Sequence, residues 1–299
     1  MQARKHRHKR RLNKRGKTAL FLLILALVGL GYWLVAGLGQ ATRQQTASST
    51  NSSSSASQNN SAKTEQVNWV KQDSEVKLPI LMYHAVHVMA AEEAANANLI
   101  VDPTTFDSHI KALKDAGYYF LSPEEAYKVL TENVLPNNNA KIVWLTFDDG
   151  NLDFYTVAYP ILKNYQAKAT NNVITNYVEN GNAANITVAQ MLEMKENGMS
   201  FQSHTANHPD LSATETSQLA TEFSQSKEFL NSQLNQDTIA LAYPSGRYND
   251  TVTSIASQYY KLAVTTDEGV ATASDGLMSL KRVRILPNTT ADGLLNQIG

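Results

Sequence analysis

Two short motifs in this chain carry residue types that can perform hydrolytic chemistry. The first, TFDDG at 146–150, places Asp148 and Asp149 side by side, and the second, SHTANH at 203–208, places His204 and His208 four residues apart. One carboxylate oxygen and two imidazole nitrogens form the three-ligand set, with an open position, of hydrolytic zinc sites. Asp149, His204 and His208 are therefore candidate metal ligands. Asp148 is then free to take a proton from a water that the metal activates.

Each motif alone also fits an ordinary structural role. An Asp-Asp-Gly sequence is typical of turns, and two histidines four apart can simply lie on the surface. Both motifs, however, directly follow apolar runs typical of β-strands. Their joint occurrence favours the metal site.

The order of apolar runs and helical segments predicts an α/β fold. Short runs bounded by turn residues alternate with segments of helical periodicity, the pattern of βα units around a parallel sheet. The predicted strands are 78–84, 141–147, 168–174, 199–203, 239–243 and 262–266, and the predicted helices are 103–116, 122–130, 154–166, 187–197, 214–234 and 250–260. Pro160 is expected to kink or divide the third helix. Both motifs then fall beyond strand carboxyl ends, where barrels of parallel strands build active sites.

One stretch fits no regular element. Residues 87–100 lack a strand or helix pattern, so we expect a loop that overhangs the site.

The amino-terminal part predicts membrane attachment. Residues 1–17 carry nine Lys/Arg and no acid, and residues 18–39 are 22 uncharged, mainly apolar residues. That length spans a bilayer as a helix, and the basic segment orients the amino terminus toward the cytoplasm. Residues 40–67 are a Ser/Thr/Asn-rich linker, and residues 68–299 form an extracellular domain. A cleaved signal peptide is the alternative to the anchor.

The charge balance of the chain after residue 17 excludes nucleic acid as a partner. Of 26 basic residues, nine lie in the first 17 positions, which leaves 17 against 27 acidic residues in the rest of the chain. A nucleic-acid-binding domain would have the opposite balance. The chain has no cysteine, so the exported domain must be stabilised by its core alone.

The sequence from residue 78 onward resembles polysaccharide deacetylases of the NodB-homology type, carbohydrate esterase family four. TFDDG matches the first motif of that family and SHTANH the second, in the expected order. The resemblance implies a distorted (β/α)7-type barrel, an N-acetylated glycan as substrate and a divalent metal, with Zn²⁺ expected. It also implies that Asp148 is the general base and that Asp149, His204 and His208 bind the metal.

The third motif of the family is only partly matched, by residues 242–247. Pro244 aligns, which makes the N–H of Ser245 the candidate donor to the oxyanion. Ala242 stands where the family has an arginine, so the group that orients the base must come from elsewhere. Arg247, Arg282 and Arg284 are the available cations near matching motifs. We predict substrate contacts for Tyr243, Arg247 and Arg282.

The family's last motif, Leu-x-His, is missing. Leu280-Lys281-Arg282 stands in its place, and no histidine follows His208. His84 ends the first predicted strand on the face of the metal site, which makes it a candidate general acid, with solvent as the alternative proton donor. Its alternative role is structural, as a strand-end histidine bonded to a neighbouring carbonyl. His109 is expected to be an exposed helical residue.

The sequence therefore predicts a membrane-anchored, extracellular, metal-dependent deacetylase of an N-acetylglucosamine-containing glycan. Met82-Tyr83-His84 and the Tyr-Pro-x-Gly form of the third motif resemble the branch that acts on poly-N-acetylglucosamine. The alternatives are a peptidoglycan deacetylase, an O-acetyl esterase and, in another class, a catalytically inactive carbohydrate-binding domain. Metal content and acetate release would separate the last of these from an enzyme.

Overall fold

The structure is a computed structural model that describes residues 66–299. The predicted cytoplasmic segment, the membrane anchor and nearly all of the linker lie outside the described residues. Among residues 66–299, no helix combines the length and the apolar character needed to cross a bilayer.

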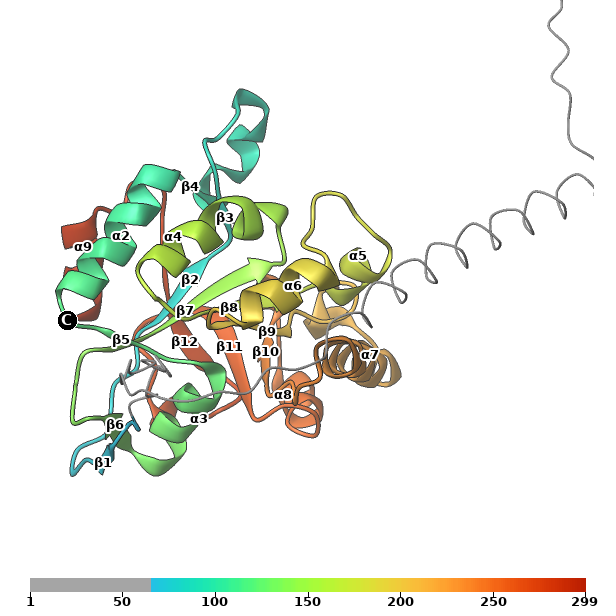
Figure 1. Cartoon of the computed structure of the whole chain (residues 1–299). Coiled ribbons are helices and arrows are strands. Elements are labelled where there is room, and N and C mark those ends of the chain that lie inside the picture. The colour runs from blue at the N-terminus through green and yellow to red at the C-terminus, as the bar shows by residue number, and fades with distance from the viewer. Residues whose placement is uncertain (1–65) are drawn as a thin grey trace, which may run out of the picture. The chain divides into compact units, whose positions relative to one another are not determined.

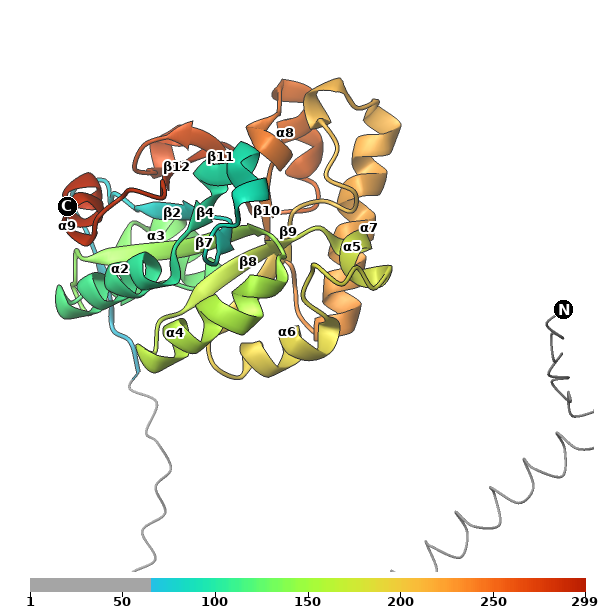
Figure 2. The ribbon, with the colours of Figure 1, turned by 90° about the horizontal axis from the view of Figure 1, so that it is seen from above.

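Seven parallel strands close into a barrel, which Figure 2 shows from above. They are β2 (Ile80–Tyr83), β7 (Ile142–Asp149), β8 (Ala169–Val173), β9 (Met199–Ser203), β10 (Ala240–Ala242), β11 (Leu262–Glu268) and β12 (Leu280–Arg284). Their spatial order is β2-β12-β11-β10-β9-β8-β7, and β2 also pairs with β7, which closes the ring. A single residue pair joins β9 to β10, and the register of β11 and β12 shifts. The predicted distorted (β/α)7-type barrel is confirmed.

Helices surround this barrel, as Figure 1 shows. They are α2 (Pro103–Asp115), α3 (Pro123–Glu132), α4 (Tyr159–Asn164), α5 (Thr175–Glu179), α6 (Val188–Lys195), α7 (Thr216–Leu234), α8 (Asp250–Ala256) and α9 (Ala291–Ile298). Asp102 caps α2 by accepting a hydrogen bond from the N–H of Thr104, and Ser122 caps α3 in a capping box. These caps satisfy N–H groups that have no partner within the helix.

The predicted helix at 154–166 is divided, as expected. A short π-type turn, η2 (Phe154–Ala158), precedes α4, and Pro160 lies at the start of α4. Proline has no N–H to donate to the preceding turn, so the regular helical ladder cannot run through this point.

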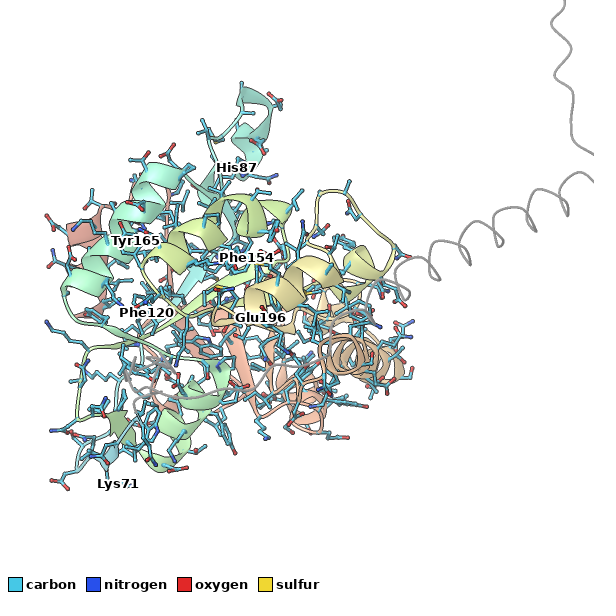
Figure 3. The ribbon with its side chains drawn as sticks, in the orientation of Figure 1. Lys71, His87, Phe120, Phe154, Tyr165 and Glu196 are labelled. Atoms are coloured by element: carbon cyan, nitrogen blue, oxygen red, sulfur yellow. The ribbon has the colours of Figure 1, made fainter. Side chains whose placement is uncertain are left out.

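Side chains alternate between the inside of the barrel and the layer beneath the helices. On β7, Trp144 packs inside with Ile80 and Leu280, whereas Phe147 belongs to the outer layer. Figure 3 marks Phe154, whose ring packs against Phe147 at 4.9 Å between centroids. The inner positions therefore recur at every second residue.

Short elements flank the barrel. Strand β5 (Tyr119–Phe120) extends the sheet beside β7, and β1 (Trp69–Lys71) pairs with β6 (Val134–Pro136). The stretch 87–100, expected as a loop, contains the 3-10 helix η1 (Ala91–Leu99). It is preceded by β3 (Ala85–Val86), and β4 (Ile100–Val101) begins at its last residue. The sequence pattern also missed β12 and α9.

The expected exposure of His109 is wrong. His109 is fully buried, its Nε2 lies 2.8 Å from the carbonyl oxygen of Thr289 and its Nδ1 lies 3.1 Å from the hydroxyl of Tyr83. Nε2–H therefore donates to the carbonyl, and the Tyr83 hydroxyl donates to Nδ1. The imidazole joins α2 to the segment that leads into α9.

Candidate active site

The inner positions become polar at the carboxyl end of the barrel. On β7 they run from Trp144 through Thr146 to Asp148, and on β12 from Leu280 through Arg282 to Arg284. A cavity of about 270 Å³ opens at this end. It is lined by His84, Leu99, Asp148, Asp149, His204, His208, Ser245, Thr266 and Arg284. The strand alternation thus collects side chains from distant parts of the sequence at one place.

The three predicted metal ligands come together in this cavity. Their candidate ligand atoms all lie within 4.8 Å of one another. Oδ1 of Asp149 is 3.4 Å from Nε2 of His204 and 3.8 Å from Nε2 of His208. His204 donates Nδ1–H to the carbonyl oxygen of Ala242 at 2.8 Å, which leaves the lone pair of Nε2 facing the cavity. The donor set and its orientation fit a divalent cation.

Protons compete with a cation at this position. Burial lowers the pKa of His204, but its hydrogen bond with Asp149 and the charge of Asp148 outweigh burial and raise it. A divalent cation bound at Nε2 would have to displace that proton, so its affinity would fall at acidic pH.

The ligand loops hold unusual backbone conformations. Asp149, Thr205 and His208 have φ values of 80°, 65° and 58°, in a region that non-glycine residues rarely adopt. The side-chain amide of Asn185 donates to the carbonyl oxygen of Asp149 at 2.9 Å, and the hydroxyl of Thr205 accepts from the N–H of His208 at 2.9 Å. Such strain persists where surrounding contacts fix it, as is common at functional sites.

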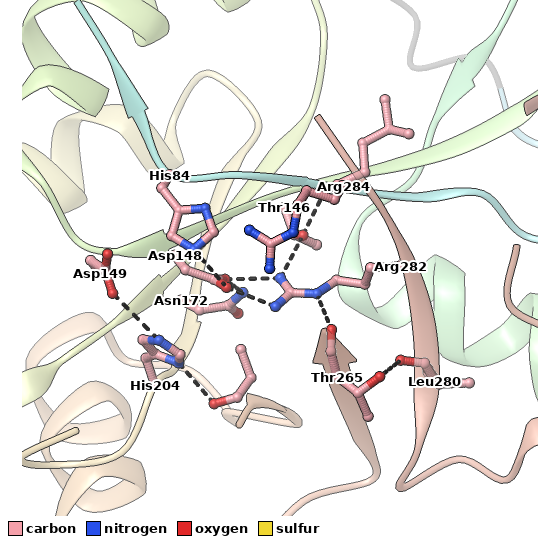
Figure 4. A network of polar contacts seen from close by, with 12 residues as sticks. His84, Thr146, Asp148, Asp149, Asn172, His204, Thr265, Leu280, Arg282 and Arg284 are labelled. Carbon is pink, nitrogen blue, oxygen red and sulfur yellow. Dashed lines mark hydrogen bonds and ion pairs between the residues drawn. The ribbon is translucent and has the colours of Figure 1, made fainter. Parts of the chain in front are cut away.

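Asp148 is held by a buried guanidinium. Arg282 donates from one nitrogen to Oδ1 at 3.0 Å and from another to Oδ2 at 2.7 Å, and Asn172 donates to Oδ1 at 2.8 Å (Figure 4). Arg282 is itself fixed by Thr265 and Thr146. Burial acts to raise the pKa of Asp148, but the charges of Arg282 and His204 outweigh it, so the pKa is lowered and the carboxylate stays ionised.

Two predicted substrate contacts are wrong. Arg282 has no exposed surface; of the three cations available to orient Asp148, it is the one that holds this carboxylate. Tyr243 is also fully buried, its hydroxyl donates to the carbonyl oxygen of Met278, and its ring stacks on Tyr248. Arg247 is 62% exposed, faces Asp210 at 3.5 Å and does not line the site cavity.

His84 lies beside Asp148. Its Nε2 is 4.0 Å from Oδ2 of Asp148 (Figure 4), and its side chain is 15% exposed. Among residues 66–299, the polar partner of its ring is Asp148 and not a backbone carbonyl, which does not match the structural alternative. Burial lowers the pKa of His84, partly opposed by Asp148 and Asp149.

Ser245 enters the cavity from a tight turn after β10. Its φ is 53° and that of Gly246 is 65°. A Cβ on Gly246 would lie 1.9 Å from Oγ1 of Thr266, so only glycine allows the turn to pack against β11. Within the described residues, the N–H of Ser245 donates to no backbone or side-chain acceptor. This N–H remains the candidate oxyanion donor.

Sequence reasoning missed Asn172 and Thr266 and gave Arg284 no role beyond that of an available cation. All three occupy inner positions near strand carboxyl ends, two residues beyond other inner positions. Every second residue of a strand faces the inside of the barrel, and extending this alternation to the end of each strand would have identified these three residues.

Comparison with known proteins places this site in a family. Residues 136–263 match the sequence profile named polysaccharide deacetylase. The Bacillus subtilis protein YxkH, whose name assigns it to the polysaccharide deacetylases, is 38% identical over 220 residues, which cover 73% of this chain and 75% of YxkH. This chain belongs to the polysaccharide deacetylase family. It is therefore a hydrolase of the deacetylase class.

Two further relatives of this polysaccharide deacetylase are informative. The structure of the Streptococcus pyogenes deacetylase PplD in complex with acetate is 60% identical, with a TM-score of 0.73, and the match covers 76% of this chain and all of that one. The poly-β-1,6-N-acetyl-D-glucosamine N-deacetylase of Staphylococcus aureus is 32% identical over 165 residues. That match covers 51% of this chain and 56% of the staphylococcal protein, so the two share about half their length.

Proposed function

We propose that this polysaccharide deacetylase is metal-dependent and removes N-acetyl groups from N-acetylglucosamine residues of an extracellular polysaccharide. One observation carries the proposal. Asp149, His204 and His208 converge on a cavity in which a second carboxylate, Asp148, is locked beside them by Arg282. A carbohydrate-binding domain that catalyses no reaction has no chemical need for both the three metal ligands and a fixed carboxylate beside them.

The residues divide the reaction between them. A divalent cation among the three ligands supplies Lewis-acid activation of a water and of the acetyl carbonyl. Asp148, ionised at neutral pH because of Arg282, accepts the proton of the attacking water. The N–H of Ser245 donates to the oxygen that gains negative charge.

His84 supplies the proton that the leaving amine needs. It lines the same cavity and lies 4.0 Å from Asp148, close enough to receive the proton through a small movement. Because burial lowers the pKa of His84, its protonated form is a stronger acid than a free imidazolium and gives up its proton readily. It replaces the histidine of the missing Leu-x-His motif.

Poly-N-acetylglucosamine is the favoured substrate. The support is the named activity of the staphylococcal relative, together with Tyr83-His84 and Tyr243-Pro244-Ser245-Gly246 in this chain. Peptidoglycan is the alternative substrate. Acetate release from the full-length metal-loaded protein, assayed on β-1,6-linked N-acetylglucosamine oligomers and on isolated peptidoglycan, tests the proposal. Faster release from peptidoglycan would identify peptidoglycan as the preferred substrate. No release from either would refute the proposed removal of N-acetyl groups from N-acetylglucosamine residues.

We also propose an extracellular location for the domain, with residues 18–39 as a single-pass anchor. The proposal rests on the nine basic residues before position 18 and the uncharged run after them. Protease added to intact cells should cut within residues 40–67 and release the domain. A domain that stays protected would contradict this topology, and a domain found free in the medium would indicate signal cleavage.

A further inference from the structure

One segment next to the site adds nothing to the core. The nine residues of η1 (Ala91–Leu99) include none that is buried, and Figure 1 shows the segment standing off the barrel between β3 and β4. Runs of 3-10 helix longer than three or four residues are uncommon. Ordering each residue costs about 1–2 kcal/mol of backbone entropy. A segment that is ordered without burying anything calls for a function outside the core.

His87 connects this segment to the rest of the domain through polar contacts of its imidazole ring. Nδ1 of His87 lies 2.7 Å from Oδ2 of Asp153, and Nε2 lies 3.1 Å from both carboxylate oxygens of Glu93. The N–H of Val86 also donates to Asp153, and the N–H of Ala90 to Glu93. Figure 3 marks His87 below the projecting segment. The imidazole thus joins η1 to the loop that follows β7.

A cavity of about 420 Å³ lies between the segment and that loop. Glu93, Asn96 and Leu99 of η1 form one wall, and Asn151 and Asp153 belong to the opposite one. The cavity shares His84, Leu99 and Asp149 with the metal-site cavity, so the two cavities adjoin along these residues. Amide and carboxylate groups suit sugar hydroxyls, and Leu99 gives a sugar ring an apolar edge.

We propose that this second cavity is a glycosyl subsite, which holds the sugar residue adjoining the one that loses its acetyl group, and that His87 positions the wall of the subsite. The proposal rests on the proposed deacetylase function. A polymer whose reacting residue lies at the metal site must continue beyond it, and this cavity adjoins the site directly. His87 is a positioning residue that acts through η1, whereas Asn96 contacts the sugar.

The test compares Asn96→Ala and His87→Gln with wild type, all as full-length metal-loaded protein. Asn197→Ala is the matched control, because Asn197 lies before β9, at the opposite end of the barrel. Substrates are β-1,6-linked N-acetylglucosamine oligomers and p-nitrophenyl acetate, which has no sugar. Asn96→Ala should raise KM for the oligomers about fivefold, the effect of one typical hydrogen bond, with kcat unchanged. His87→Gln should act in the same direction. Turnover of p-nitrophenyl acetate should not change in either variant.

Several results would overturn the subsite. If Asn96→Ala had the KM of wild type for the oligomers, the subsite would be refuted and the proposed function would stand. The subsite would also be refuted if Asn96→Ala lost as much activity on p-nitrophenyl acetate as on the oligomers. Thermal melting of each variant separates a local effect from a folding defect. Asn96 is an exposed residue of η1, which has no buried residue, so alanine there should not disturb the core. If wild type released no acetate, the proposed function would fail by itself. Calorimetric binding of the same oligomers would then decide the subsite, and equal affinity in wild type and Asn96→Ala would refute it.

Discussion

Replacing Arg282 by lysine tests how this enzyme holds Asp148, its proposed general base. The guanidinium of Arg282 makes two hydrogen bonds to Asp148 and one each to Thr146 and Thr265. A lysine keeps the positive charge but has one nitrogen, which cannot span both carboxylate oxygens and both threonines. Asp148 would keep an ion pair and lose its fixed orientation.

The magnitude follows from these contacts. Each hydrogen bond to a charged group contributes about 1.5–3 kcal/mol, and Arg282→Lys loses at least one of them at Asp148. If the loss falls on the transition state, about 2.7 kcal/mol lowers kcat about 100-fold. Arg282→Met goes further, because an unpaired buried carboxylate costs about 3–5 kcal/mol of folding stability. Burial then dominates and raises the pKa of Asp148, so the acid limb of the pH–rate profile moves to higher pH.

The assay is acetate release against pH, with metal content and melting temperature measured on the same samples. Arg282→Lys should bind metal like wild type and melt several degrees lower, because the lost hydrogen bond also lowers folding stability, while kcat falls. Lys128→Ala, on α3 away from the site, is the control. A wild-type kcat in Arg282→Lys would refute the claim that the two-pronged contact positions the base.

Two further predictions follow from buried histidines. His84→Gln should lower kcat on N-acetylated oligomers about 100-fold. Its kcat on p-nitrophenyl acetate should stay near that of wild type, because nitrophenolate leaves without a proton. Equal losses of kcat on both substrates would contradict the assignment of His84 as the acid. Burial lowers the pKa of His109, so the unfolded state binds its proton first as the pH falls below about 6.5. The stability that neutral His109 contributes is present above that pH and is lost as the pH falls toward the folded-state pKa. Melting temperatures between pH 8 and pH 5 should therefore fall more steeply for wild type than for His109→Gln, and parallel curves would contradict this role.

The metal ligands and the barrel could be read from the sequence because both depend on local patterns. TFDDG lies at the carboxyl end of β7, and SHTANH begins at the last residue of β9; parallel strands end at the same face. The caps of α2 and α3 are likewise set within four residues, by Asp102 and Ser122. Local chemistry was sufficient for these features.

Other features depend on contacts across the chain. Arg282 is separated from Asp148 by 134 residues, and LKRVR at 280–284 has the composition of an exposed edge rather than of a buried strand. Closure of the ring by β12 beside β2 turns Arg282 inward. His109 meets the carbonyl of Thr289 across 180 residues. No spacing within either segment indicates these partners.

The central claim is that two adjacent carboxylates have different tasks, with Asp149 binding a metal and Asp148 moving a proton. Metal content per chain and acetate release, measured together on Asp148→Asn and Asp149→Asn, test it most directly. Asp148→Asn should retain the metal of the wild type and lose about 10²- to 10⁴-fold in turnover, whereas Asp149→Asn should lose metal and activity together. Metal lost from Asp148→Asn and kept by Asp149→Asn would contradict the account.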